Sequence, residues 1–192
     1  MRRPCALIAA LMFLVAPALA ETAEQGLTLE GSARTGTLSH AVRFLFVCTE
    51  ARMPGTIGTL AIELWLNDYP SLRPAFDVDP FEGPGATAGV LSALQSSGAK
   101  GKGAARFGAA GWITIEKPYT TFALGISAAR RGDAQRLKQL TEVLRPLVDG
   151  PSELIWTQGN AKKGGTPIVA RLTLDAAQAA TLKDTLKRCI AG

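Results

Sequence analysis

The chain has little of the material from which most catalytic and metal sites are made. Its 192 residues include one histidine, three cysteines, 6% aromatic residues and 19% charged residues. A single histidine argues against a tetrahedral zinc site, which takes four ligands from cysteine, histidine and carboxylate side chains. No apolar run after residue 20 approaches the roughly 20 residues that a membrane-spanning helix needs. The apolar share of 47% excludes a disordered tail and indicates a folded core.

The N-terminal residues 1–20 have the three parts of an export signal. Arg2 and Arg3 form a positive start, residues 6–16 form an apolar run, and Ala18–Ala20 gives a small-x-small cleavage site. The run is too short for an uncleaved membrane anchor. We therefore expect export to the periplasm or the medium, with a mature chain that begins at Glu21.

The net charge of the chain and its expected export limit the classes of partner that it can bind. Loss of the two arginines of the signal lowers the formal net charge from +5 to +3. That excess is too small for a nucleic-acid-binding surface. No phosphate-binding glycine motif is present, and no cofactor is predicted. The expected partner is an envelope protein or polymer.

The cysteines predict one disulfide bond. Cys5 lies inside the expected signal, which leaves Cys48 and Cys189. Cys48 falls on the apolar face of an alternating, strand-like run, and Cys189 shares a helical stripe with Leu182 and Leu186. In an oxidising compartment such a pair usually forms a bridge. The alternative is a reactive thiol, which needs exposure and an activating base.

The pattern of the remaining residues predicts one α+β domain over 21–192, built mainly from hairpins. Residues 40–48 and 59–66 alternate as strands around a turn at Met53–Gly55. The other expected strands are 112–116, 120–126, 153–157 and 168–174, and the expected helices follow Asp133 and Asp175. Hairpins followed by late helices favour an antiparallel sheet packed by two to three helices over a parallel sheet.

Three other segments are assigned from composition. Residues 21–36 are polar and unpatterned and suggest a loose entry segment, and Thr87 suggests the cap of a short helix over 88–95. The glycine-rich run 96–108 predicts a flexible basic loop. Its cations Lys100, Lys102 and Arg106 are candidates for contact with an anionic polymer.

A weak internal repeat is also present. An ungapped shift of 108 residues aligns 48–50 with 156–158 and 60–66 with 168–174. Either a duplication or the shared alternation of two hairpins explains this similarity.

The hydrolase motifs are each incomplete. Gly125–Ala129 has the layout of a nucleophile elbow around Ser127, but the only histidine, His40, lies upstream of it. Ser97 and Lys100 have the spacing of penicillin-binding enzymes, but the pair straddles a glycine and the partner motifs are absent.

The acidic segment 76–83 is the most distinctive local feature. Asp77 and Asp79 alternate with an apolar residue, and Glu82 follows closely. Three carboxylates would suit a hard cation or acid–base work on a glycan. Alternatively, the segment is a solvated turn that Phe76 and Phe81 anchor to the core, and its aspartates cap free backbone amides.

These observations favour an exported, non-catalytic accessory or binding protein, because each catalytic motif lacks a partner. The alternative is a small envelope hydrolase that uses Asp77, Asp79 or Glu82.

Overall fold

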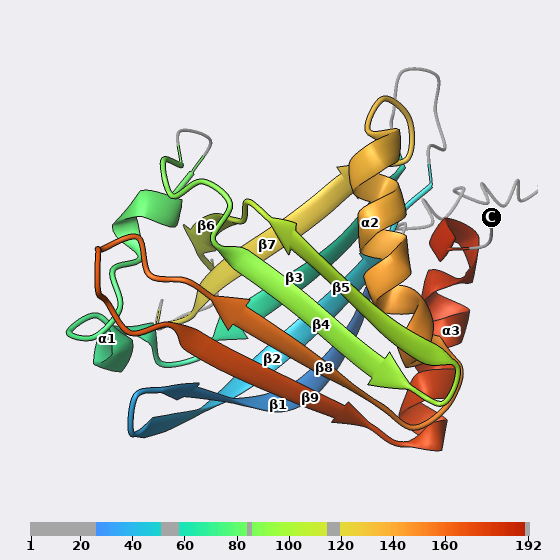
Figure 1. Cartoon of the computed structure of the whole chain (residues 1–192), viewed down its shortest axis with the longest axis horizontal. Helices are drawn as coiled ribbons and strands as arrows, with labels where there is room; N and C mark the ends of the chain where they lie inside the picture. The colour runs from blue at the N-terminus through green and yellow to red at the C-terminus, as the bar shows by residue number, and fades with distance from the viewer. Residues whose placement is uncertain (1–25, 51–57, 84–85, 115–119, 191–192) are drawn as a thin grey trace, which may run out of the picture.

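The computed structural model describes residues 26–50, 58–83, 86–114 and 120–190. Nine strands form one antiparallel sheet in the order β5-β4-β8-β9-β1-β2-β3-β7-β6. The sheet is curled, so that the half containing β4, β5, β8 and β9 lies across the half containing β2, β3 and β7 (Figure 1). The strands are β1 (Gly26–Thr35), β2 (Leu38–Cys48), β3 (Thr59–Leu66), β4 (Ser92–Gly98), β5 (Gly101–Phe107), β6 (Ala110–Ile113), β7 (Phe122–Ala129), β8 (Ser152–Gln158) and β9 (Ile168–Leu174).

The curl has its origin at β1. This strand pairs with β2 along all of its ten residues, from Gly26 to Thr35. It pairs with β9 only from Ser32 to Thr35. The two halves of the sheet therefore share a short seam and separate beyond it, which allows one half to fold over the other.

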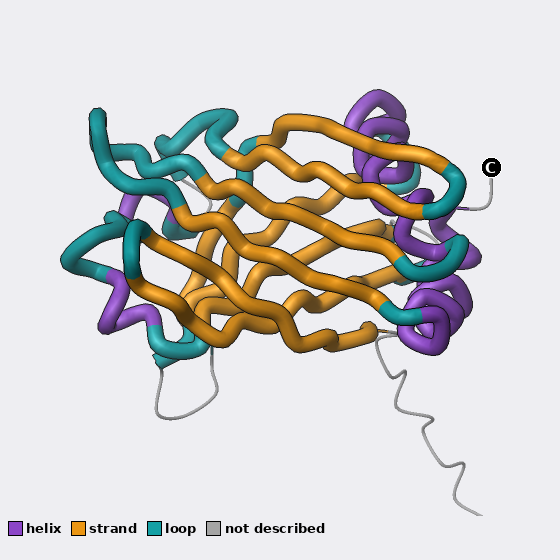
Figure 2. The backbone as a smooth tube through the Cα atoms, turned by 60° about the horizontal axis from the view of Figure 1, so that its bottom comes forward, coloured by secondary structure: helices purple, strands orange, loops and turns teal. Residues whose placement is uncertain are grey.

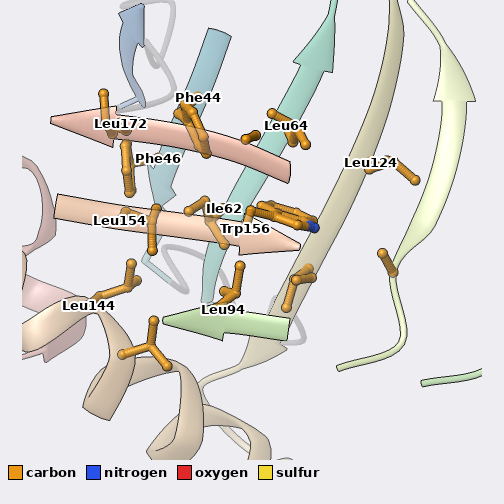
Figure 3. Packing of buried hydrophobic residues seen from close by; sticks show 14 of the residues in the cluster. Phe44, Phe46, Ile62, Leu64, Leu94, Leu124, Leu144, Leu154, Trp156 and Leu172 are labelled. Carbon is orange, nitrogen blue, oxygen red and sulfur yellow. The ribbon is translucent and has the colours of Figure 1, made fainter. Parts of the chain in front are cut away.

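The core fills the space between the two halves. Alternation in β2 and β3 sends every second side chain inward, as the sequence predicts. These residues meet the inward side chains of β4, β8 and β9 (Figure 3). The fully buried residues labelled there include Phe44, Phe46, Ile62, Leu64, Leu94, Leu154, Trp156 and Leu172.

Helices make a smaller contribution to the core than the sheet does. The helix α2 (Ala134–Leu144) and the helix α3 (Ala176–Ile190) lie at one end of the sheet, and the short α1 (Tyr69–Leu72) lies at the other (Figures 1 and 2). Two 3-10 turns, η1 (Asp79–Phe81) and η2 (Arg145–Val148), complete the description. The α+β prediction is correct in outline, but the sheet packs chiefly against itself. None of the helices in the described ranges is long and apolar enough to cross a membrane.

The two long helices begin differently. Asp175 and Gln178 form a capping box, in which the Gln178 amide donates to Asp175 Oδ1 at 2.8 Å and the Asp175 amide donates to Gln178 Oε1 at 3.0 Å. Asp133 precedes α2 as expected, but its side chain makes no capping hydrogen bond. The predicted cap is therefore confirmed for α3 only.

The loose entry segment predicted over 21–36 is wrong for residues 26–35, which form β1. Leu27 and Leu29 face the core near its start, but its later inward residues are small: Gly31, Ala33 and Thr35. A Cβ atom on Gly31 would lie 2.7 Å from the Phe44 ring, so the glycine makes room for that ring. The strand escaped detection because its apolar signal is weak.

The predicted helix over 88–95 and the flexible loop over 96–108 are also wrong. These residues contain the β4–β5 hairpin, and β4 pairs with β8 along its whole length. Two of its glycines are required by close packing. A Cβ atom would lie 2.4 Å from the Pro146 carbonyl oxygen at Gly98, and 2.4 Å from that of Glu142 at Gly103. Glycine density here reflects the approach of another backbone rather than flexibility.

The two hairpins aligned by the 108-residue shift differ in register. Cys48 pairs with Leu60 in the first hairpin, whereas Trp156 pairs with Ala170 in the second. The shift would require Trp156 to pair with Ile168. The registers of the two hairpins therefore differ by two residues, and an ungapped repeat does not describe them. The expected signal 1–20, the turn at Met53–Gly55 and the turn expected at Lys117–Pro118 between the strands 112–116 and 120–126 lie outside the described residues.

Candidate functional site

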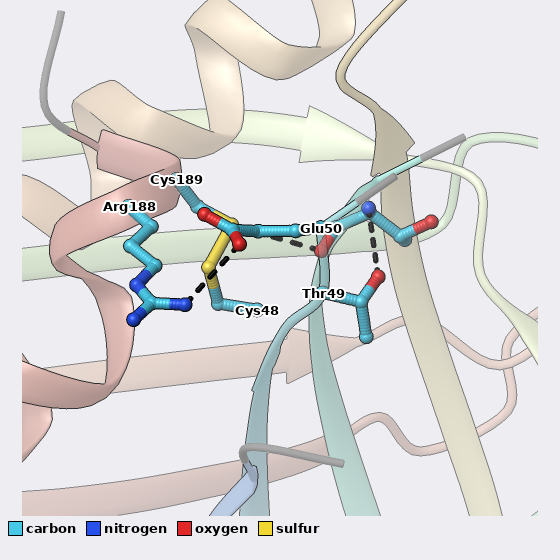
Figure 4. Close-up of a disulfide and its surroundings, with 6 residues drawn as sticks. Cys48, Thr49, Glu50, Arg188 and Cys189 are labelled. Carbon is cyan, nitrogen blue, oxygen red and sulfur yellow. Dashed lines mark hydrogen bonds and ion pairs between the residues drawn. A yellow bond between two sulfur atoms is a disulfide. The ribbon is translucent and has the colours of Figure 1, made fainter. Parts of the chain in front are cut away.

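The predicted disulfide bond is confirmed. Cys48 ends β2 and Cys189 lies in the last turn of α3, with 5.9 Å between their Cα atoms and 141 residues between them in sequence. Arg188 pairs with Glu50 at 3.2 Å beside the bridge (Figure 4). Both cysteines are buried. The bridge therefore ties the C-terminal helix to the sheet and offers no reactive thiol.

The acidic segment forms a turn. Asp77 Oδ1 accepts the Asp79 amide at 3.2 Å, and the Asp79 carboxylate pairs with Arg73 at 3.1 Å. Phe76 and Phe81 are fully buried and stack with ring centroids 5.6 Å apart. These contacts match the anchored turn described above. Within the described ranges, no group of three or more His, Cys, Asp or Glu side chains is placed to hold a metal ion.

The three basic candidates are distributed along the β4–β5 hairpin. Lys100 lies in its turn and pairs with Asp149 at 3.2 Å, and Asp149 also lies 3.9 Å from Lys183. Lys102 and Arg106 lie on β5 and are exposed. The hairpin thus holds two of these cations on an ordered strand and the third in its turn.

Ser127 and His40 do not form a catalytic pair. Ser127 is exposed on the outer face of β7. It pairs with Ala61 of β3, which in turn pairs with Val47 of β2, so the three residues form one row across the sheet. His40 lies seven residues from Val47 along β2, which corresponds to about 23 Å of strand. The strand also places His40 on the opposite face, because seven is an odd number of residues. No proton transfer between them is possible.

Sequence analysis missed a furrow on the outer face of the sheet. Its volume is about 360 Å³, and it lies over β2, β3, β7 and β6. Trp112 of the edge strand β6 forms one wall and is 37% exposed. Its lining also includes Leu45 and Val47 of β2, Thr49, and Thr59 and Glu63 of β3.

The floor of the furrow is made of small residues. They are Ala61 of β3 with Gly125 and Ser127 of β7, and the other two outward residues of β7, Ala123 and Ala129, are also small. The Trp112 indole occupies the space above Gly125, where a Cβ atom would lie 2.6 Å from Trp112 Cη2. The ring therefore packs directly on the backbone at Gly125, in space that a larger side chain at that position would fill.

Polar groups beside the furrow are held in position. The Trp65 indole nitrogen donates to Glu63 Oε2 at 2.7 Å. The Arg43 guanidinium lies 4.7 Å from the centre of the Trp65 ring, and its Nε donates to Asn67 Oδ1 at 3.0 Å. Thr49 Oγ1 accepts the Thr59 amide at 2.9 Å. The furrow thus combines an exposed aromatic surface with oriented hydrogen-bonding groups.

One signal in the sequence marks this surface. The outward positions of 122–129 are all small, whereas the nearby strand segments carry Trp65 and Trp112. The signal becomes meaningful only when β7 is known to lie between β3 and β6.

Comparisons of the chain with models of known protein families, with curated proteins and with solved structures find no match.

Proposed function

We propose that the chain is an exported, non-catalytic binding protein and that it holds a saccharide in the Trp112 furrow. The observation that carries the proposal is the position of Trp112: the residue is 37% exposed, and its indole rests across Gly125 beside an open furrow. Tryptophan is enriched at binding surfaces, because its large apolar ring gains from being covered and its N–H can still find a partner.

The lining of the furrow suits a sugar ring. A pyranose has one flat, mainly C–H face and a rim of hydroxyl groups. The Trp112 ring offers an apolar surface to the flat face, and Glu63 offers acceptors to the hydroxyls at a position fixed by Trp65. Ser127 and Thr59 add hydroxyls. Mostly apolar linings with a few placed polar groups are the usual form of small-ligand sites.

Two further features support an extracytoplasmic setting. The N-terminal pattern of residues 1–20 is that of an export signal. The Cys48–Cys189 bond is of a kind that persists in oxidising compartments. A binding protein outside the cytoplasm meets envelope polysaccharides directly.

The alternative function, a hydrolase based on the acidic segment, gains no support from the geometry. Asp77 serves the backbone of its own turn, and Asp79 is paired with Arg73. Ser127 has no histidine within reach. No observation in the described residues favours a bond-breaking role.

Cosedimentation with purified peptidoglycan sacculi tests the proposal. The chain without residues 1–20 is expected to sediment with sacculi and to be released by soluble oligomers of N-acetylglucosamine. Trp112→Ala is expected to weaken binding at least tenfold, which corresponds to about 1.4 kcal/mol. Trp112→Phe retains a ring and is expected to recover part of the binding.

Val90→Ala is the matched control, because Val90 is 57% exposed and does not line the furrow. It is expected to bind like the parent chain. The proposal is overturned if neither sacculi nor soluble oligosaccharides bind, or if Trp112→Ala binds as well as the parent.

A further inference from the structure

The two edges of the sheet are protected to different degrees. At the β6 edge, Glu82 forms a bridge with Gly111, and the Gly83 amide donates to the Gly111 carbonyl at 2.9 Å. At the other edge, β5 pairs with β4 alone. In the part of the chain that the structure describes, no backbone group outside β4 bonds to residues 101–107. The outer side of β5 therefore presents unpaired amide and carbonyl groups, which is the template for strand addition.

Most residues in the first part of this edge are small, and the Lys100 side chain reaches Asp149 only at the turn that precedes β5. A groove of about 480 Å³ runs between Lys100–Ala104 on one side and the last turn of α2, η2 and Asp149 on the other. Gly101, Gly103 and Ala104 contribute almost no side chain there. An extended segment thus has space to lie beside β5.

The charges around this edge are unbalanced. The acidic residues already have lysine partners: Glu142 lies 4.0 Å from Lys138, and Asp149 pairs with Lys100 and Lys183. Three exposed cations near the edge have no ion pair or side-chain hydrogen bond in the described ranges. They are Lys102, Arg106 and Arg145.

The charges of these cations determine which kind of strand can pair with β5. A second copy of β5 would bring Lys102 and Arg106 next to like charges, which disfavours pairing between copies. An acidic strand would find complementary charges instead. Lys102 and Arg106 are four residues apart on one face, so they lie about 13 Å apart along the strand. Carboxylates at positions i and i+4 of an added strand match this spacing.

We propose that the β5 edge binds an extended acidic segment of a partner protein as a tenth strand of the sheet. Backbone hydrogen bonds supply the pairing, and carboxylates of the segment lie opposite Lys102 and Arg106. Arg145 attracts the same segment from the side of the groove. This surface lies in the other half of the sheet from the Trp112 furrow and is independent of the saccharide proposal.

A synthetic peptide of alternating glutamate and valine is the probe, with binding to the chain without residues 1–20 measured by fluorescence anisotropy. The peptide is expected to bind and to lose affinity as salt is raised. A peptide of the same sequence with N-methylated amides on one edge is expected not to bind, because it cannot pair as a strand. Equal binding of the N-methylated peptide would refute strand addition.

The double variant Lys102→Glu with Arg106→Glu is expected to bind the peptide roughly tenfold more weakly or worse, since two attractive cross-strand pairs become repulsive. The matched control is Lys162→Glu with Lys163→Glu, which makes the same change of net charge on the exposed β8–β9 loop. Its affinity is expected to stay within twofold of the parent. An equal loss in both double variants, or no binding by the parent chain, would overturn the proposal.

Discussion

Gly103 of β5 faces the backbone carbonyl oxygen of Glu142 in α2 so closely that a Cβ atom on the glycine would lie 2.4 Å from that oxygen. Nothing larger than hydrogen fits between the strand and the helix at this point. The contact fixes α2 on the edge strand and explains why a glycine-rich run is ordered.

Gly103→Ala is therefore expected to destabilise the fold by about 1–3 kcal/mol, because the helix must move away from the strand. Denaturant unfolding of the oxidised chain measures the change. Ala104→Val enlarges the neighbouring residue on the exposed face of the same strand and is expected to stay within about 0.5 kcal/mol of the parent. Equal stability of Gly103→Ala and the parent would show that α2 does not approach β5 this closely.

The capping box of α3 gives a second prediction. Asp175→Ala removes the carboxylate that accepts the Gln178 amide and is expected to cost about 1 kcal/mol of unfolding free energy. Asp133→Ala is the control, because Asp133 occupies the same position before α2 without a side-chain capping bond. Its cost is expected to be below about 0.5 kcal/mol. A comparable loss in both variants would contradict the difference between the two helix starts.

The disulfide bond gives a third prediction. The chain without residues 1–20, unfolded without reductant, is expected to show no free thiol. The double variant Cys48→Ser with Cys189→Ser is expected to lose up to about 5 kcal/mol of stability, as the chain-entropy model gives for a loop with a sequence separation of 141 residues. Thiol titration and denaturant unfolding measure these quantities. Two free thiols in the unreduced chain would refute the bridge.

Limited trypsin digestion gives a fourth prediction. Lys102 and Arg106 lie in a paired strand, whereas Lys162 and Lys163 are exposed in the loop between β8 and β9. Cleavage after Lys162 or Lys163 is expected before cleavage after Lys102 or Arg106. The disulfide should hold the two fragments together until reductant is added, which mass spectrometry detects. Earlier cleavage within β5 would contradict its order.

The sequence predicted those parts of the fold in which large apolar side chains alternate. Phe44 and Phe46 mark β2 clearly, and the stripe of Leu182, Leu186 and Cys189 marks α3. The same reading failed where the inward residues are small. In β4 and β5 the inward positions include Ser96 and Gly103, which are selected by the close approach of α2 rather than by hydrophobicity.

The furrow escaped prediction for a different reason. The β6–β7 hairpin was expected, and so was the β2–β3 hairpin. The pairing of β3 with β7, which brings Ala61 beside Ser127, joins residues far apart in sequence. Local periodicity carries no information about such pairs, so the outward faces of the two hairpins were not recognised as one surface.

The pairing of β1 with β9 sets the order in which the chain can finish folding. Ser32 and Arg171 are neighbours in the seam, so β1 cannot complete its pairing before β9 is present. The seam between the two halves cannot close while the C-terminal part is still being synthesised. A chain of this topology stays incompletely folded until nearly all of it has been made, because the contacts of the seam join residues far apart in the sequence.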